Sequence, residues 1–242
     1  LHDWVRSERT TVEASDTTFV PSWLAEQTAA GVVAEHRTVT VGFVFFGGVD
    51  DLLTTEGPDV VNERLQALAT ATREAADKFG VFWLASDVYA GGGKIILTAG
   101  APRSTGQDED AAVRAARALI ETDVGLPVRI GLNRGPVYMG DLGSSRRRTF
   151  TVMGDAVNLA ARLMQKSTAG QVVASQAVLD LIPTPMKSQT LEPFLVKGKT
   201  EPIRASLVGE LLVGETQESE AASVPTVGFA GRNDELRRLA AA

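Results

Sequence analysis

Apolar residues in the first half of the chain follow first a strand pattern and then a helical one. Residues 38–46 read TVTVGFVFF, a β-branched and aromatic run that predicts a buried strand. Gly47 and Gly48 follow and are expected to break it. Between residues 57 and 79 the apolar side chains recur at helical spacing, which predicts a helix with one buried face.

The rest of the pattern continues this alternation of strands and helices. Two apolar runs, 81–86 and 94–99, flank a glycine-rich turn and predict a hairpin. The later elements are expected to be a helix over 111–120, strands over 127–132, 136–140 and 150–153, a helix over 155–164 and a strand over 172–174. The order β-α-β-β-α-β with added strands predicts an α+β fold, a ferredoxin-like split βαβ sandwich.

The two ends of the chain lack these patterns. Residues 1–37 mix polar stretches with short apolar pieces and are interpreted as a linker or flanking element. Residues 213–226 are polar and acidic with few apolar anchors, which is typical of a flexible linker. The folded domain is therefore expected to span residues 38–212.

Composition narrows the function classes. Of the 242 residues 44% are hydrophobic and 22% charged, and no apolar run approaches the about 20 residues that cross a bilayer. A net charge of −6 argues against nucleic acid as the main partner. The absence of cysteine fits a reducing compartment, so a cytoplasmic location is expected. A chain that starts at Leu1 rather than Met is expected to be a segment of a longer protein.

One long motif carries a resemblance. Residues 130–163 read IGLNRGPVYMGDLGSSRRRTFTVMGDAVNLAARL, and this segment resembles the class III adenylyl/guanylyl cyclases. The likeness extends more weakly over residues 37–212 and includes the VKGKTEP stretch near the end. Residues 227–242 resemble the opening of the ATPase-like module that follows such domains in large signalling proteins.

Asn158 and Arg162 are the candidate catalytic residues. Their spacing of four on a helix places both side chains on one face, where they can reach one ligand. The resemblance implies that Asn158 orients the ribose of ATP and that Arg162 neutralises charge at the α-phosphate during cyclisation to 3′,5′-cyclic AMP and pyrophosphate. The alternative is that Asn158 caps locally and Arg162 forms a surface ion pair.

Four further residues are candidates for substrate binding. The resemblance implies that Lys197 or Lys199 meets the terminal phosphates and that Thr151 reads the base. Thr151 could equally serve strand propensity, and Asp155 could contact the nucleotide or act as a helix N-cap. The lysine that reads adenine in the family falls near Tyr89 in this chain, so base preference is weakly supported.

The metal-binding carboxylates of the family are missing. Aligning residues 38–52 on the family's first strand, and counting back from the GAP at residues 100–102, puts Phe45 and Gly93 where catalytically complete members carry aspartates. Neither residue can coordinate Mg²⁺. Asp50, Asp51 and Asp87 lie nearby in sequence but are poorly placed to substitute. The GGGK run that ends at Lys94 lacks the spacing of a Walker A loop. No metal site is therefore predicted in this chain.

These observations predict half of an active site. By resemblance the chain is the second, C2-like half of a tandem cyclase, and its metal-bearing partner domain is expected upstream in the same polypeptide, holding the Mg²⁺ or Mn²⁺. A homodimer of this chain is predicted to be inactive. The alternative is a catalytically inactive regulatory domain that binds a nucleotide or other ligand and controls the ATPase-like region.

Overall fold

The computed structural model describes residues 34–144, 147–196 and 198–212. Its strands are β1 (Glu35–Gly47), β2 (Phe82–Tyr89), β3 (Gly92–Ala99), β4 (Val128–Ser144), β5 (Arg147–Met153), β6 (Val172–Ser175), β7 (Met186–Thr190) and β8 (Ala205–Leu211). Its helices are α2 (Val49–Thr55), α3 (Pro58–Phe79), α4 (Asp108–Glu121), α5 (Asp155–Lys166) and α6 (Gln176–Leu179). The two ends that were expected to be linkers and an ATPase-like module lie outside the described residues, except for residues 34–37.

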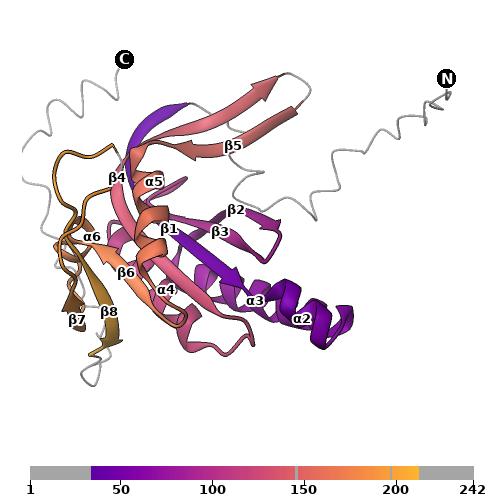
Figure 1. The fold of residues 1–242 in the computed structure, drawn as a ribbon. Coiled ribbons are helices and arrows are strands. Elements are labelled where there is room, and N and C mark those ends of the chain that lie inside the picture. The colour runs from indigo at the N-terminus through magenta and orange to yellow at the C-terminus, as the bar shows by residue number, and fades with distance from the viewer. Residues whose placement is uncertain (1–33, 145–146, 197, 213–242) are drawn as a thin grey trace, which may run out of the picture. The chain divides into compact units, whose positions relative to one another are not determined.

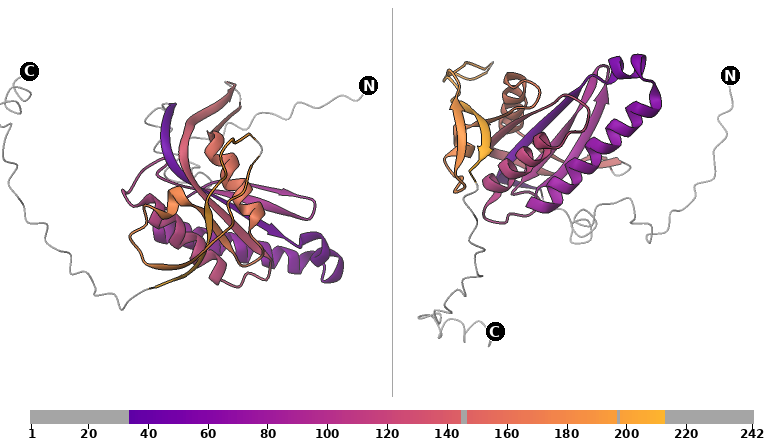
Figure 2. Two further views of the ribbon diagram at one scale, coloured as in Figure 1. Left: turned by 60° about the vertical axis from the view of Figure 1, so that its left-hand side comes forward. Right: turned by 90° about the horizontal axis from the view of Figure 1, so that it is seen from below.

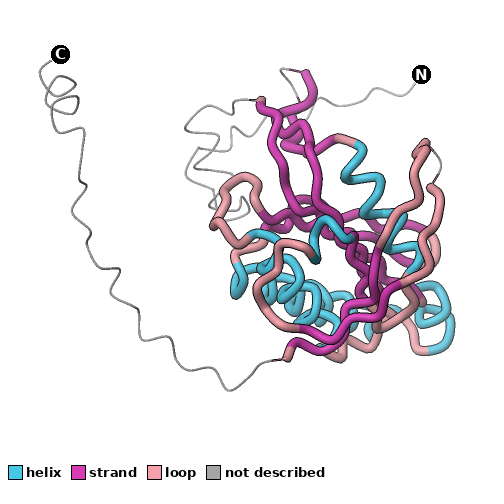
Figure 3. Tube along the Cα trace, turned by 90° about the vertical axis from the view of Figure 1, so that its left-hand side faces the viewer, coloured by secondary structure: helices cyan, strands magenta, loops and turns pink. Residues whose placement is uncertain are grey.

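All eight strands belong to one sheet, with the order β2-β3-β1-β4-β6-β8-β7 and with β5 paired to β4 (Figure 1). β1 lies between β3 and β4 and is antiparallel to both, whereas β4 and β6 are parallel. Beyond Met139, β4 pairs with β5 alone, so these two strands extend from the sheet as an arm (Figure 3). The expected α+β sandwich is confirmed.

Helices cover both faces of the sheet (Figure 2). Side chains of β1 alternate between the two sides, as strand geometry requires. Val44 and Phe46 pack into a core with α3 and α4, whereas Val39 and Val41 pack with α5 on the opposite face. The sheet therefore separates the layer that contains α3 and α4 from α5, the helix that carries Asn158 and Arg162.

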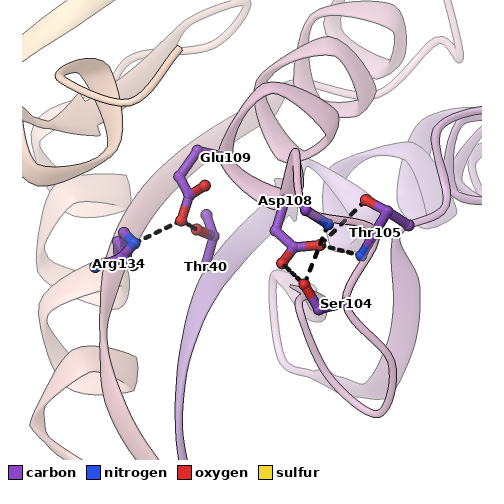
Figure 4. A network of polar contacts seen from close by, with 7 residues as sticks. Thr40, Ser104, Thr105, Asp108, Glu109 and Arg134 are labelled. Atoms are coloured by element: carbon purple, nitrogen blue, oxygen red, sulfur yellow. Dashed lines mark hydrogen bonds and ion pairs between the residues drawn. The ribbon is translucent and has the colours of Figure 1, made fainter. Parts of the chain in front are cut away.

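A polar network joins the start of α4 to the sheet (Figure 4). Arg134 on β4 pairs with Glu109 at 2.5 Å, and Thr40 on β1 donates a longer hydrogen bond of 3.4 Å to the same carboxylate. Asp108, the first residue of α4, accepts hydrogen bonds from the Thr105 backbone N–H and the Ser104 hydroxyl of the preceding loop. These contacts hold α4 in register with β1 and β4.

Two predicted strands form one continuous strand. Residues 127–132 and 136–140 were expected to be separate because of Gly135 and Pro136, but both residues pair with β1 inside β4. Pro136 falls between the part of β4 that pairs with β6 and the part that pairs with β5. Its missing N–H therefore interrupts no ladder on that side, which lets the strand run through it.

The hairpin of β2 and β3 is longer than predicted. Gly92 and Gly93 were expected in the turn, yet both are paired with β1 inside β3. A Cβ atom at Gly92 would lie 2.1 Å from the backbone oxygen of Phe46, so the two strands approach more closely there than a side chain permits. The glycine run in this segment reflects that close approach as well as the turn.

Several smaller features also differ from the prediction. β1 begins at Glu35, before the expected domain start at Thr38. The short helix α2 was not predicted; it begins after Gly48, which has the positive φ of 77° that glycine adopts readily. β7 and β8 were not predicted because their sequences, MKSQT and ASLVGEL, carry only weak apolar alternation.

Candidate functional site

The helix α5 is the scaffold of the candidate site. It begins at Asp155 and ends at Lys166, close to the predicted range. Its buried residues are Ala156, Ala160, Leu163 and Met164, which recur at helical spacing and face the sheet. Asn158 and Arg162 fall on the other side and are exposed.

Gly131 allows α5 to rest directly on β4. A Cβ atom at Gly131 would lie 2.2 Å from the backbone nitrogen of Met164 and 2.3 Å from the backbone oxygen of Ala160. Nearby, the buried Asn133 amide donates a hydrogen bond of 3.0 Å to the Ala156 carbonyl. The backbone of the helix is therefore held against the backbone of the strand, which fixes where Asn158 and Arg162 stand.

Asn158 and Arg162 share one exposed face of α5 with Asp155. The Arg162 guanidinium donates a hydrogen bond of 3.1 Å to the Gln165 side chain, and no carboxylate of the described residues lies within ion-pair distance of it. Asn158 makes no side-chain hydrogen bond within the described part of the chain. Both polar groups thus face outward, where a phosphate or a hydroxyl can meet them.

Asp155 pairs with Lys199 and is not an N-cap. The N-cap position of α5 is Gly154, which has a φ of 151° and provides no side-chain hydrogen bond. The capping alternative for Asp155 was therefore wrong, because the aspartate lies inside the first turn and its carboxylate forms an ion pair with Lys199. This pair brings Lys199 from the segment before β8 to the same stripe of α5 as Asn158 and Arg162.

The structure gives less information about Thr151 and Lys197, the other two candidates for substrate binding. Thr151 lies on β5, half-buried and paired with Gly140, a short distance before α5 begins. Lys197 lies outside the described residues.

The positions of the missing metal carboxylates do not fit a metal ion. Phe45 and Gly93 offer no oxygen ligand, and no group of three or more His, Cys, Asp or Glu side chains in the described segments could hold one. Asp50 and Asp51 are exposed in the first turn of α2, and the Asp87 carboxylate pairs with Lys94 at 3.3 Å. None of these aspartates takes the place of the missing ligands.

The two positions also face opposite sides of the sheet. Phe45 pairs with Lys94 and Phe46 with Gly93. Cross-strand partners share a face and neighbours along a strand alternate, so positions 45 and 93 point in opposite directions. A Cβ atom at Gly93 would lie 2.3 Å from the Phe46 ring and 2.6 Å from the Asp87 backbone oxygen. The Phe46 ring therefore fills the space into which a carboxylate at position 93 would project.

Arg129 is a residue of this region that sequence reasoning missed. Its guanidinium lies over the Phe45 ring, 4.5 Å from the centroid, because β4 pairs with β1 at this point. Neither residue is fully buried. No spacing along the chain links positions 45 and 129, so only the register of the sheet reveals the contact.

Comparisons with known proteins agree on the family. The adenylate and guanylate cyclase catalytic domain family matches residues 33–209. An adenylate cyclase of Mycobacterium tuberculosis is 25% identical over 238 residues, which cover 93% of this chain and 52% of that protein. An uncharacterized protein of the same organism is 32% identical over 163 residues, covering 64% of this chain and 29% of its own length. The chain thus spans about half or less of these relatives.

Solved structures show the same fold. The guanylate cyclase domain of RhGC from Catenaria anguillulae, solved in complex with GTP, is 25% identical with a TM-score of 0.64, covering 73% of this chain and 99% of that one. The adenylyl cyclase CyaB from P. aeruginosa, at 23% identity, has a TM-score of 0.64 over 74% of this chain and 96% of that one. Within the described residues no helix is long and apolar enough to cross a membrane. The chain belongs to the adenylate and guanylate cyclase catalytic domain family.

Proposed function

We propose that this chain is the C2-like half of a heterodimeric nucleotide cyclase that converts ATP to 3′,5′-cyclic AMP and pyrophosphate in cytoplasmic signalling. The observation that carries the proposal is the asymmetry of its polar residues. Asn158, Arg162 and Lys199 gather on the exposed face of α5, while Phe45 and Gly93 stand where metal ligands are needed. Mg²⁺ or Mn²⁺ would be held by a partner cyclase domain and not by this chain.

The exposed face of α5 suits the chemistry of cyclisation. When the ribose 3′-oxygen attacks the α-phosphorus in line with the departing pyrophosphate, negative charge is spread over the phosphoryl oxygens. Arg162 would bind those oxygens with its planar fork, and Asn158, one turn earlier, would hold the ribose in the attacking position. Interactions of this kind accelerate the reaction because they are strongest in the transition state.

Lys199, Thr151 and Asp155 would complete the nucleotide contacts. Lys199 is exposed in its ion pair with Asp155, and exposed ion pairs contribute little stability. Lys199 can therefore leave Asp155 and bind a triphosphate with little loss of stability. The Asp155 carboxylate, once released, and the Thr151 hydroxyl could then form hydrogen bonds with the base. Lys197 belongs to the same VKGKT stretch and is a second candidate for the terminal phosphates.

The test is the exchange of Arg162 for alanine in the full-length protein or in a mixture with a metal-bearing cyclase domain. Because one donor to the transition-state charge is lost, cyclic AMP formation should fall by about two to three orders of magnitude. Arg73→Ala, at an exposed position on α3, is the matched control and should leave the rate unchanged. An undiminished rate in Arg162→Ala would overturn the proposal.

A second candidate function is a regulatory domain that binds a nucleotide without turning it over. The lack of metal ligands at Phe45 and Gly93 favours this regulatory function. The exposure of Asn158 and Arg162 on α5 favours catalysis. A mixture of the chain with a metal-bearing cyclase domain, supplied with ATP and with GTP in parallel, separates the two. Binding without cyclic product from either nucleotide would establish the regulatory function.

A further inference from the structure

A polar pocket lies between the short helix α6 and the strands β7 and β8, which form one end of the sheet (Figure 1). Its volume is about 280 Å³, close to the lower end of the range for small-molecule sites. Five of the residues that line it have polar, uncharged side chains: Gln176, Thr184, Ser188, Thr190 and Ser206. The pocket therefore has the size and the polarity of a site for a small ligand.

Three of these polar groups have unused hydrogen-bonding capacity. Ser206 on β8 is only 3% exposed, and its hydroxyl makes no hydrogen bond within the described residues. A buried hydroxyl without a partner costs free energy, which a ligand can recover by bonding to it. Thr184 Oγ1 accepts a hydrogen bond of 2.6 Å from Arg114, so its own O–H is left to donate. The Gln176 Nε2 donates to Asp180 at 2.7 Å, which leaves its Oε1 to accept.

The surroundings of the pocket favour an uncharged ligand. No charged or aromatic side chain is among the residues that line it in the described part of the chain. The Arg114 guanidinium behind Thr184 is already paired with the Asp110 carboxylate at 2.6 Å. A charged ligand would therefore lose its hydration without gaining a counter-ion, and a flat base would find no ring to stack on. The apolar part of the lining packs against the core and consists of Leu179, Ile182 and Met186.

The pocket lies on the face of the sheet opposite α5. Ser206 is paired with Ala174 on β6, and Ala174 packs into the core with α3 and α4. Its neighbour Val173 points the other way and packs with Leu163 of α5. Because directly opposed residues share a face, Ser206 lies on the side of α3 and α4. The pocket thus uses none of the residues assigned to cyclisation.

We propose that this pocket binds a small uncharged molecule with several hydroxyl groups, such as a sugar alcohol. Hydroxyl groups both donate and accept hydrogen bonds, which matches Ser206, Thr184 and Gln176, and the carbon skeleton of the ligand suits the apolar part of the lining. A water molecule takes about 30 Å³ in the liquid, so the pocket has room for about ten non-hydrogen atoms, the size of a five-carbon sugar alcohol. The proposal goes beyond the proposed function and does not depend on it.

The test measures the binding of xylitol to the full chain through the shifts of its backbone amide NMR signals. We expect saturable shifts at Thr184 and Ser206, with a Kd of about 10 mM or lower. S206A should weaken binding about fivefold, because one hydrogen bond to the ligand is lost. Thr190 is exposed at the rim, and T190W should abolish binding because the indole fills the pocket. Xylonate, which carries a carboxylate on the same carbon skeleton, should bind at least about fivefold more weakly.

Two matched controls accompany these variants, and thermal unfolding checks that each protein folds. S175A is the control for S206A, because the Ser175 hydroxyl on β6 is also buried without a partner among the described residues but is not part of the lining. Q189W is the control for T190W, because Gln189 is the next residue on β7 and faces the other side of the sheet. Both controls should bind xylitol as the unaltered chain does.

Three results would overturn the site. The first is the absence of saturable shifts, which would mean that the pocket holds water only. The second is an equal loss of binding in a variant and its control, and the third is xylonate binding as tight as that of xylitol. Each result leaves the cyclase proposal to its own test, because that test measures turnover in Arg162→Ala.

Discussion

The position of Lys199 beside α5 follows from the fold and could not be predicted from the sequence. The lysine is separated from Asp155 by more than forty residues of chain, yet the two form an ion pair at the first turn of α5. The sequence motif nominates both residues but says nothing of their contact. In the proposed function this contact keeps the ammonium beside Asn158 and Arg162 before any nucleotide arrives.

Lys199→Ala should raise the KM for ATP more than it lowers kcat. The lysine is proposed to meet the terminal phosphates, so its loss removes binding energy that substrate and transition state share in large part. We expect an increase in KM of about five- to tenfold, measured by steady-state cyclic AMP formation with a metal-bearing cyclase domain.

Lys78→Ala serves as the control for this prediction, because Lys78 is an exposed lysine on α3 that lies against the Phe79 ring. Its kinetics should match those of the unaltered chain. A fall in kcat as deep as that of Arg162→Ala, with KM unchanged, would show that Lys199 acts on the transition state instead.

The contact between Phe45 and Arg129 marks the limit of prediction at this scale. The alignment of the first strand singles out Phe45 as a residue without an oxygen ligand for a metal. The guanidinium above its ring follows only from the pairing of β1 with β4, and the pairing of two strands distant in sequence is not encoded in either one.

At the scale of elements, α5 could be predicted well and the strands around it less so. Gly154 before the helix and the regular spacing of its apolar residues define α5 from the sequence alone. The unbroken β4 and the long hairpin could not be foreseen, because Pro136 and Gly93 read as turn residues until their neighbours are known. Local propensity is overridden where tertiary pairing satisfies the backbone.

Gly131→Ala should destabilise the domain and displace α5. The added methyl group would meet backbone atoms at 2.2 and 2.3 Å, which cannot rotate away, so helix and strand must separate. We expect the free energy of unfolding in urea to fall by about 2–3 kcal/mol, with a loss of cyclic AMP formation beyond what stability explains.

Gly42→Ala provides the comparison for that experiment. Its Cβ atom would lie 3.3 Å from the Leu132 side chain, which can adjust, so the expected cost is below about 1 kcal/mol. Equal stabilities of the two variants would mean that the close approach at Gly131 does not hold α5.

At the scale of the whole molecule, the proposed function divides nucleotide binding and metal binding between two domains. In that proposal the exposed face of α5 would supply neutral and cationic groups for a nucleotide, whereas Phe45 at the end of β1 offers no carboxylate for a metal. Under the proposed function, two copies of this chain would build two sites that share the same deficiency.

The double variant F45D/G93D should not acquire a metal site. The two carboxylates would project to opposite faces of the sheet, and the one at position 93 would meet the Phe46 ring. Titration with Mn²⁺ should show no more binding than the single variants F45D and G93D, with thermal unfolding as the check that each protein folds. Tight Mn²⁺ binding in the double variant alone would refute this geometry.

The opposed faces of positions 45 and 93 limit how a metal site could be introduced into this domain. Two substitutions alone would not bring a pair of carboxylates together here, because the register between β1 and β3 would have to change as well. In the proposed function, this arrangement leaves the supply of metal ligands to a partner domain, so changes in either domain would act on one shared catalyst.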